Sequence, residues 1–205
     1  MSINSFADFT EMHTSFLQEI GNMGAGNAAT ALSDMVTAPT DISVPTVKIV
    51  SSAEGCKLVD MLSGRTAAYL ITLCGDLKGS LLFVIPFAFV ERLVQTYFPG
   101  ISIKSKADMD EMATSVVREM VNIVAASYAN NFAMISGFMV DISVPEATTA
   151  PSMGIMAQQL IGTQALCFIN NTLEIVDCKK NFNVLFFPEL ETIKKFMGKI
   201  GIACD

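Results

Sequence analysis

Metal-ligating and redox side chains are scarce in this sequence. Tryptophan is absent, histidine occurs only as His13, and the five cysteines form no CxxC pair. Zinc sites and disulfide frameworks need such residues in close, regular spacing, so we expect neither and predict reduced thiols. His13 has no recognisable third group to orient it beside a nucleophile, so we do not expect catalysis there.

Positive charge and long apolar runs are also limited. Lys and Arg number 13 against 20 Asp and Glu, which gives a net charge of −7. The basic residues are scattered, whereas a nucleic-acid interface needs them clustered, so no nucleic-acid partner is expected. The longest apolar run, 81–90, contains Pro86 and is far shorter than the roughly 20 residues of a membrane helix. With no cationic leader pattern at its start, the sequence predicts a cytoplasmic protein without a membrane span.

What the sequence does contain is a repeat. The pentapeptide DISVP stands at 41–45 and again at 141–145, an offset of 100. At that offset fifteen residues between positions 7 and 45 are identical to their counterparts, where unrelated sequence would give about two or three. We therefore predict a single domain over 1–205, built from internal repeats at about 1–100 and 101–205 and joined near 99–106.

Each half has the same predicted order of elements. A long helix is followed by a strand, an irregular stretch, two strands and a tail helix. The predicted ranges are 9–35, 41–50, 53–64, 66–74, 77–85 and 87–98 in the first half, and 108–136, 139–145, 148–160, 163–178, 182–187 and 188–199 in the second. Turn residues at 74–79 and 169–171 favour antiparallel pairing. The predicted fold is α/β, with two pseudo-symmetric halves sharing a largely antiparallel sheet and two long helices packed on it.

Both long helices are predicted to carry a polar face that lacks Lys and Arg. At 100° per residue, one face spans about 60° and holds Ser15, Glu19, Asn22 and Gly26; its counterpart holds Ser115, Glu119, Asn122 and Ala126. We place Asp8 and Ala29 on the same face, and Met23 on an apolar face directed at the core. Glu and Asn one turn apart are common on exposed helices, but their recurrence beside small residues in both halves predicts a docking face.

The repeated spacing then resembles a known signature. Ser-x3-Glu-x2-Asn, followed after 22 residues by Pro, ends at Pro45 in the first half and at Pro145 in the second. With QEIGNMGAGNAATALSDM at 18–35, the pattern is similar to that of CheC-type chemotaxis phosphatases, the family of CheC, CheX and FliY. The resemblance covers the chain in length and layout and implies the two-site class of that family.

The resemblance implies hydrolysis of the aspartyl phosphate of a phosphorylated CheY-like receiver. The implied catalytic residues are Glu19, Asn22, Glu119 and Asn122, with Asn orienting the attacking water and Glu pairing with a receiver lysine. Ser15, Ser115, Gly26 and Ala126 are expected at the partner interface, while Pro45 and Pro145 are expected to shape the strand beside each helix. No metal or other cofactor is expected on this chain, because the receiver supplies Mg²⁺. The CheD deamidase is a second implied partner, and His13 is left as a surface residue.

Other functions remain open at this stage. The chain could be a non-catalytic adaptor that binds CheD or a flagellar switch component, or a duplicated structural protein with no receiver partner. A nucleotide-binding loop is not expected at GAGNAA (24–29), because this stretch differs from GxGxxG and lies inside a helical pattern rather than after a strand.

Overall fold

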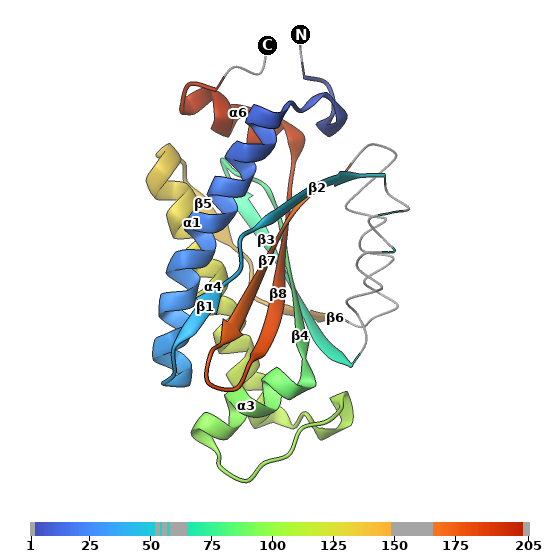
Figure 1. Ribbon diagram of the computed structural model, residues 1–205, viewed down its shortest axis with the longest axis vertical. Helices are drawn as coiled ribbons and strands as arrows, with labels where there is room; N and C mark the ends of the chain where they lie inside the picture. The colour runs from blue at the N-terminus through green and yellow to red at the C-terminus, as the bar shows by residue number, and fades with distance from the viewer. Residues whose placement is uncertain (1–2, 52–53, 55–56, 58–64, 149–165, 203–205) are drawn as a thin grey trace.

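The computed structural model describes residues 3–51, 54, 57, 65–148 and 166–202, and it confirms the predicted α/β fold (Figure 1). The predicted irregular stretches, 53–64 and 148–160, lie almost entirely outside the described residues. The first half contains η1 (Phe6–Asp8), α1 (Glu11–Val36), β1 (Thr40–Ile42), β2 (Thr46–Val50), β3 (Thr66–Gly75), β4 (Gly79–Pro86) and α3 (Phe87–Tyr97). The second contains η2 (Lys106–Asp108), α4 (Glu111–Ser136), β5 (Val140–Ile142), β6 (Glu146–Thr148), β7 (Leu166–Ile175), β8 (Lys180–Pro188) and α6 (Leu190–Lys199).

The two halves share one antiparallel sheet and exchange their short strands. Its order is β1-β7-β8-β4-β3-β5, with β2 also paired to β7 and β6 to β3. The centre joins the halves, since Leu82 of β4 pairs with Leu185 of β8. At the edges, β1 and β2 of the first half pair with β7 of the second, and β5 and β6 pair with β3 of the first. Each half therefore completes the other.

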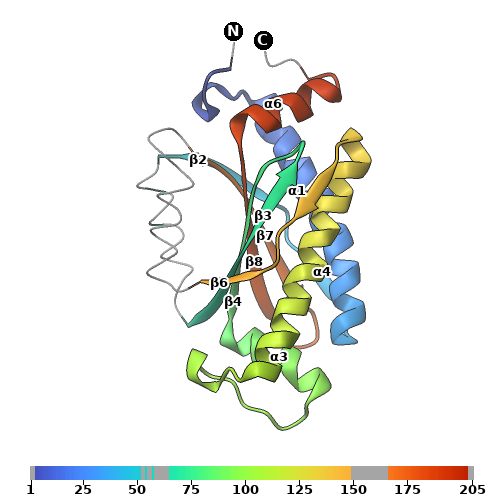
Figure 2. The ribbon, with the colours of Figure 1, turned by 180° about the vertical axis from the view of Figure 1, so that it is seen from behind.

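Helices α1 and α4 lie side by side and antiparallel on one side of the sheet (Figures 1 and 2). Both have 26 residues. Their buried residues recur at helical spacing, including Leu17 and Leu32 on α1 and Val117 and Val124 on α4. This layer forms the main core with the inward side chains of the strands. Among the described residues, no helix is both long and apolar enough to cross a membrane.

The buried face of α1 differs from the predicted one. Met23, predicted to face the core, is exposed, whereas Ala29, predicted on the polar face, is buried. The reason is that glycines and alanines, not the larger residues, meet the neighbouring helix. Gly24 packs so closely on Tyr128 of α4 that a Cβ placed there would lie 2.5 Å from the Tyr128 ring. This contact rotates the buried face away from Met23.

The start of α1 corrects two further expectations. His13 is buried, not a surface residue, because its Nδ1 accepts a 3.0 Å hydrogen bond from the backbone N–H of Thr10 and so caps the first turn. Asp8 lies before the helix, in η1, where its carboxylate accepts the backbone N–H groups of Asn4 and Ser5. These bonds hold the pKa of Asp8 below its ordinary value. The identity of Asp8 and Asp108 thus reflects a repeated turn rather than a helix face.

Two strand predictions also change. The single strand predicted at 41–50 is two short strands, interrupted at 43–45, and the strand predicted at 139–145 ends at Ile142, with β6 beginning only at Glu146. The prolines explain the break, because proline has no N–H to donate to a ladder. The turn predicted at 169–171 is wrong, since these residues lie inside β7. The β7–β8 turn comes later and includes Lys179 at φ 52°.

Candidate functional site

The first candidate site lies on the exposed face of α1. Ser15, Glu19 and Asn22 are exposed, and Gly26 is half-buried with no heavy atom within 4 Å of a Cβ built on it. The helical spacing places these residues on one face, opposite the side buried against α4 and the sheet. A carboxylate and a carboxamide are therefore presented to solvent one turn apart, with open space beyond them.

The second candidate site repeats this arrangement on α4. Ser115 and Glu119 are exposed, and Asn122 and Ala126 are half-buried. The two Glu–Asn pairs belong to different helices, α1 and α4, which run antiparallel (Figure 2). The structure thus brings the polar residues together within each helix, and leaves the two sets as separate sites.

The proline loop is part of the first site. Pro45 is buried, and its carbonyl oxygen accepts a 2.8 Å hydrogen bond from Nε2 of Gln18, the residue before Glu19. A Cβ on Gly21, the residue before Asn22, would lie 3.2 Å from Cβ of Pro45. The loop is therefore packed against the turn of α1 that carries both Glu19 and Asn22.

The second site differs at the residue that touches the loop. Arg118 takes the place of Gln18 and makes no hydrogen bond to Pro145 among the contacts of the described residues, and Pro145 is half-buried. Arg118 lies near Tyr69 of β3: burial raises the pKa of Tyr69, and the charge of Arg118 opposes that rise. The two sites consequently present the same Ser, Glu and Asn side chains outward. They differ in charge beside the Glu, where the first site has Gln18 and the second has Arg118.

Each proline loop is anchored on a strand from the other half of the chain. The backbone N–H of Ser43 donates to the carbonyl of Thr172 in β7 at 2.9 Å, and the N–H of Ser143 donates to the carbonyl of Thr72 in β3 at 2.9 Å. Each site is thus assembled from both halves. Sequence reasoning did not identify the anchoring serines, although both lie inside the repeated DISVP.

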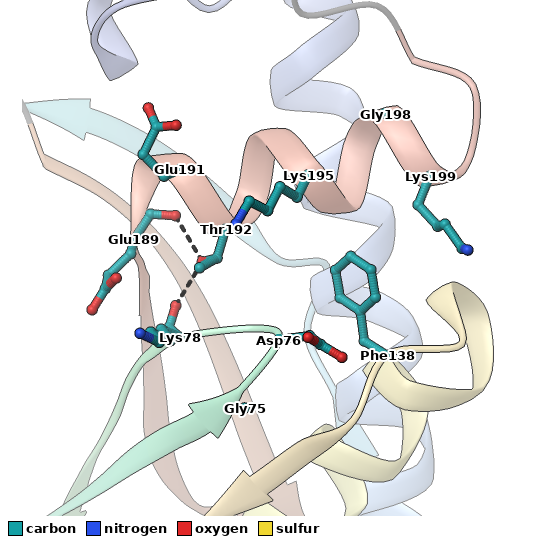
Figure 3. A pocket seen from close by; sticks show the side chains of 10 residues that line it. All are labelled: Gly75, Asp76, Lys78, Phe138, Glu189, Glu191, Thr192, Lys195, Gly198 and Lys199. Atoms are coloured by element: carbon teal, nitrogen blue, oxygen red, sulfur yellow. Dashed lines mark hydrogen bonds between the residues drawn. The ribbon is translucent and has the colours of Figure 1, made fainter.

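A separate hollow of about 680 Å³ lies between α6, the β3–β4 turn and Phe138 (Figure 3). Three lysines and three acids line it: Lys78, Lys195, Lys199, Asp76, Glu189 and Glu191. Thr192 closes one wall, where its hydroxyl donates to the carbonyls of Lys78 and Glu189. The hollow contains none of the predicted site residues, and its balanced charge selects no ligand class.

Among the described residues, no group of three or more His, Cys, Asp or Glu side chains is arranged to hold a metal ion. The two sites instead offer a carboxylate, a carboxamide and a hydroxyl on an exposed helix. Such groups can pair with a cation on another molecule, or hold a water by donating and accepting hydrogen bonds at once.

Comparison with known proteins finds similarity over both long helices and the loops that follow them. A model of the CheC-like family matches residues 12–49 and 112–148, which are the two helix-and-proline-loop units. The CheY-P phosphatase CheC of Bacillus subtilis is 30% identical over 207 residues, covering 96% of this chain and 97% of that protein.

Solved structures show the same fold. FliY of Thermotoga maritima superposes with a TM-score of 0.74 at 21% identity, covering 94% of this chain and 98% of that one. The match to the CheX-CheY-BeF3-Mg+2 complex from Borrelia burgdorferi has a TM-score of 0.57 at 16% identity and covers 82% of this chain and 96% of that one.

Proposed function

This chain belongs to the CheC-like family, and from that premise we propose that it hydrolyses the aspartyl phosphate of a CheY-like receiver in chemotaxis signalling. The observation that carries the proposal is the outward Glu–Asn pair on each long helix, in a chain 30% identical to a CheY-P phosphatase. The related fold in the CheX-CheY-BeF3-Mg+2 complex supports a CheY-like partner.

In the proposed mechanism, Asn22 and Asn122 each hold the attacking water. A carboxamide both donates and accepts hydrogen bonds, so it can fix a water in line with the bond between phosphorus and the leaving carboxylate oxygen. The aspartyl phosphate is already activated, and the receiver provides its own Mg²⁺ and lysine. Catalysis on this chain is then a matter of positioning, which can supply several kcal/mol without covalent chemistry or a resident metal.

Glu19 and Glu119 dock the receiver in this proposal. Each carboxylate lies one turn before its Asn on the same exposed face, where it would pair with the receiver's active-site lysine. Ser15 and Ser115 extend the contact by one turn, and Gly26 and Ala126 let the receiver backbone approach closely. Pro45 and Pro145 hold the adjoining strands without touching phosphate.

The proposal is tested by phosphate release from a phosphorylated CheY-like receiver. The chain is expected to accelerate release above the receiver's own rate, in the cytoplasmic setting that such a partner implies. A chain that binds the receiver, CheD or a switch component but leaves the release rate unchanged would be an adaptor instead. Binding of CheD is a further part of the proposal, and co-purification with a CheD deamidase tests it separately.

The docking role of the two glutamates gives a measurable expectation. Glu19→Gln/Glu119→Gln is expected to lower kcat/KM by about 30-fold, because losing one member of a desolvated interfacial pair costs about 2 kcal/mol or more. Asp34→Asn is the matched control, since Asp34 is an exposed acid on α1 three turns beyond Asn22. Steady-state phosphate release measures kcat/KM for both variants. An equal loss of kcat/KM in the two variants would contradict a docking role for Glu19 and Glu119.

A further inference from the structure

Two of the most exposed apolar side chains in the described residues occupy the same position in each half. Val44 is 77% exposed and Val144 is 76% exposed. Both precede the proline of a DISVP repeat, in the β1–β2 and β5–β6 connections. A single exposed valine is ordinary on a protein surface. Two valines with matching exposure at matching positions call for a common physical reason.

Both valines are held outward by fixed loops. On one side of Val44, Ser43 donates its N–H to the Thr172 carbonyl at 2.9 Å, and the Ser43 hydroxyl accepts the Thr172 N–H at 3.3 Å. On the other side, buried Pro45 accepts the hydrogen bond of Gln18. Val44 is therefore fixed between two anchored neighbours and does not reach its exposed position by loop fraying.

The second loop repeats the serine anchor. Ser143 donates its N–H to the Thr72 carbonyl at 2.9 Å, and its hydroxyl accepts the Thr72 N–H at 3.0 Å. Val144 follows Ser143 directly, so the residue before it is anchored by two hydrogen bonds equivalent to those of Ser43 before Val44. The same serine anchor therefore precedes the exposed valine in both loops.

Val44 adjoins the Glu19–Asn22 site, and Val144 holds the equivalent position in the second half. Pro45, the next residue after Val44, packs against Gly21 and bonds Gln18, which flank the turn of Glu19 and Asn22. A protein that covers Glu19 and Asn22 therefore meets the loop at its edge. Fixed apolar groups beside polar catalytic groups are what a protein partner can desolvate at little cost in conformational entropy.

We propose that Val44 and Val144 are apolar docking contacts for the phosphorylated receiver, one at each site. The proposal rests on the proposed function and adds a property of the partner: the receiver must present an apolar side chain beside its phosphorylated aspartate. Because the valines touch no reacting atom, they contribute binding that is equal in the ground state and the transition state. Such binding sets KM and leaves kcat unchanged.

The experiment measures KM and kcat for phosphate release with Val44→Ser/Val144→Ser. We expect KM to rise about tenfold with kcat unchanged, because burying one valine side chain at an interface strengthens binding about tenfold. Val176→Ser is the matched control: Val176 is 46% exposed in the β7–β8 turn, outside both loops, and its KM should match the wild type. Val44→Thr/Val144→Thr keeps the side-chain shape and should give an intermediate KM.

A site-resolved version makes the test local. In an Asn122→Asp background only the first site should work, so Val44→Ser should raise KM and Val144→Ser should not. An unchanged KM in the double serine variant, or a fall in kcat alone, overturns the docking role. If the wild type accelerates hydrolysis while either result is obtained, the proposed function stands and only the valine contact is lost. If the wild type itself has no effect, the proposed function fails first.

Discussion

Replacing both water-holding amides is expected to abolish catalysis while leaving the fold intact. In Asn22→Ala/Asn122→Ala we expect the accelerated rate of phosphate release to fall by about 100-fold or more, to the receiver's own rate. The physical reason is that alanine cannot donate and accept hydrogen bonds, so the attacking water loses its alignment with the phosphorus–oxygen bond. Asn22 is exposed and Asn122 is half-buried, and no side-chain hydrogen bond of either supports the described fold, so unfolding free energy should change by less than about 0.5 kcal/mol.

The single variants supply the control for this expectation. Since the two sites lie on different helices, Asn22→Ala and Asn122→Ala should each remove only one contribution, and the two residual rates should add up to the wild-type rate. The residual rate of each single variant then reports the strength of the opposite site. A double variant that keeps the full rate would contradict the assigned role of both amides, and a single variant that loses all activity would assign catalysis to one site.

Local patterns in the sequence predicted the two long helices and the exposed positions of Glu19 and Glu119. The repeat at an offset of 100 predicts both long helices and gives their polar residues the same relative places. The structure leaves Glu19 and Glu119 exposed, as a docking face requires. Helix spacing is a local property, so residues three and four apart share a face whatever surrounds the helix.

Long-range pairing is what the sequence could not reveal. Nothing in DISVP indicates that Ser43 would bond Thr172 of the opposite half, because hairpin signals report only neighbouring strands. Polar and apolar residues alternate in DISVP, which favours one continuous strand with Ile42 and Val44 on the same face. The structure instead breaks the strand there and leaves Val44 exposed. His13 was misplaced for a different, local reason: it bonds Thr10 at the helix start and lies beside the ring of Phe9, 5.3 Å away between centroids.

The sequence also does not reveal which glycine of GAGNAA (24–29) packs against the other long helix, and this contact predicts a large loss of stability. Gly24→Val is expected to lower the free energy of unfolding by about 3 kcal/mol, at the upper end of overpacking costs. A Cβ at Gly24 would lie 2.5 Å from Cδ1 and 2.8 Å from Cε1 of Tyr128. The Tyr128 ring is fully buried and packs edge-on against Phe132, with 6.2 Å between ring centroids, so a shift of the ring must displace neighbouring core side chains.

Gly26→Val is the matched control for Gly24→Val. It makes the same chemical change two residues away, yet a Cβ at Gly26 meets no heavy atom within 4 Å. Its unfolding free energy should therefore stay within about 0.5 kcal/mol of the wild type. For a chain of this size, a 3 kcal/mol loss corresponds to a fall in Tm of about 6–12 °C, which thermal unfolding of the two variants resolves directly.

A second substitution separates helix crowding from a general loss of structure. Tyr128→Leu removes the ring that the new valine would strike, so it should destabilise the wild type through lost packing but recover part of the loss in Gly24→Val. A coupling of at least about 1 kcal/mol is expected in this double-mutant cycle. Additive effects would place the strain elsewhere. If Gly24→Val were as stable as Gly26→Val, α1 and α4 could not be as close as Gly24 and Tyr128 require, and the outward orientation of Glu19 and Asn22, which this contact fixes, would lose its structural basis.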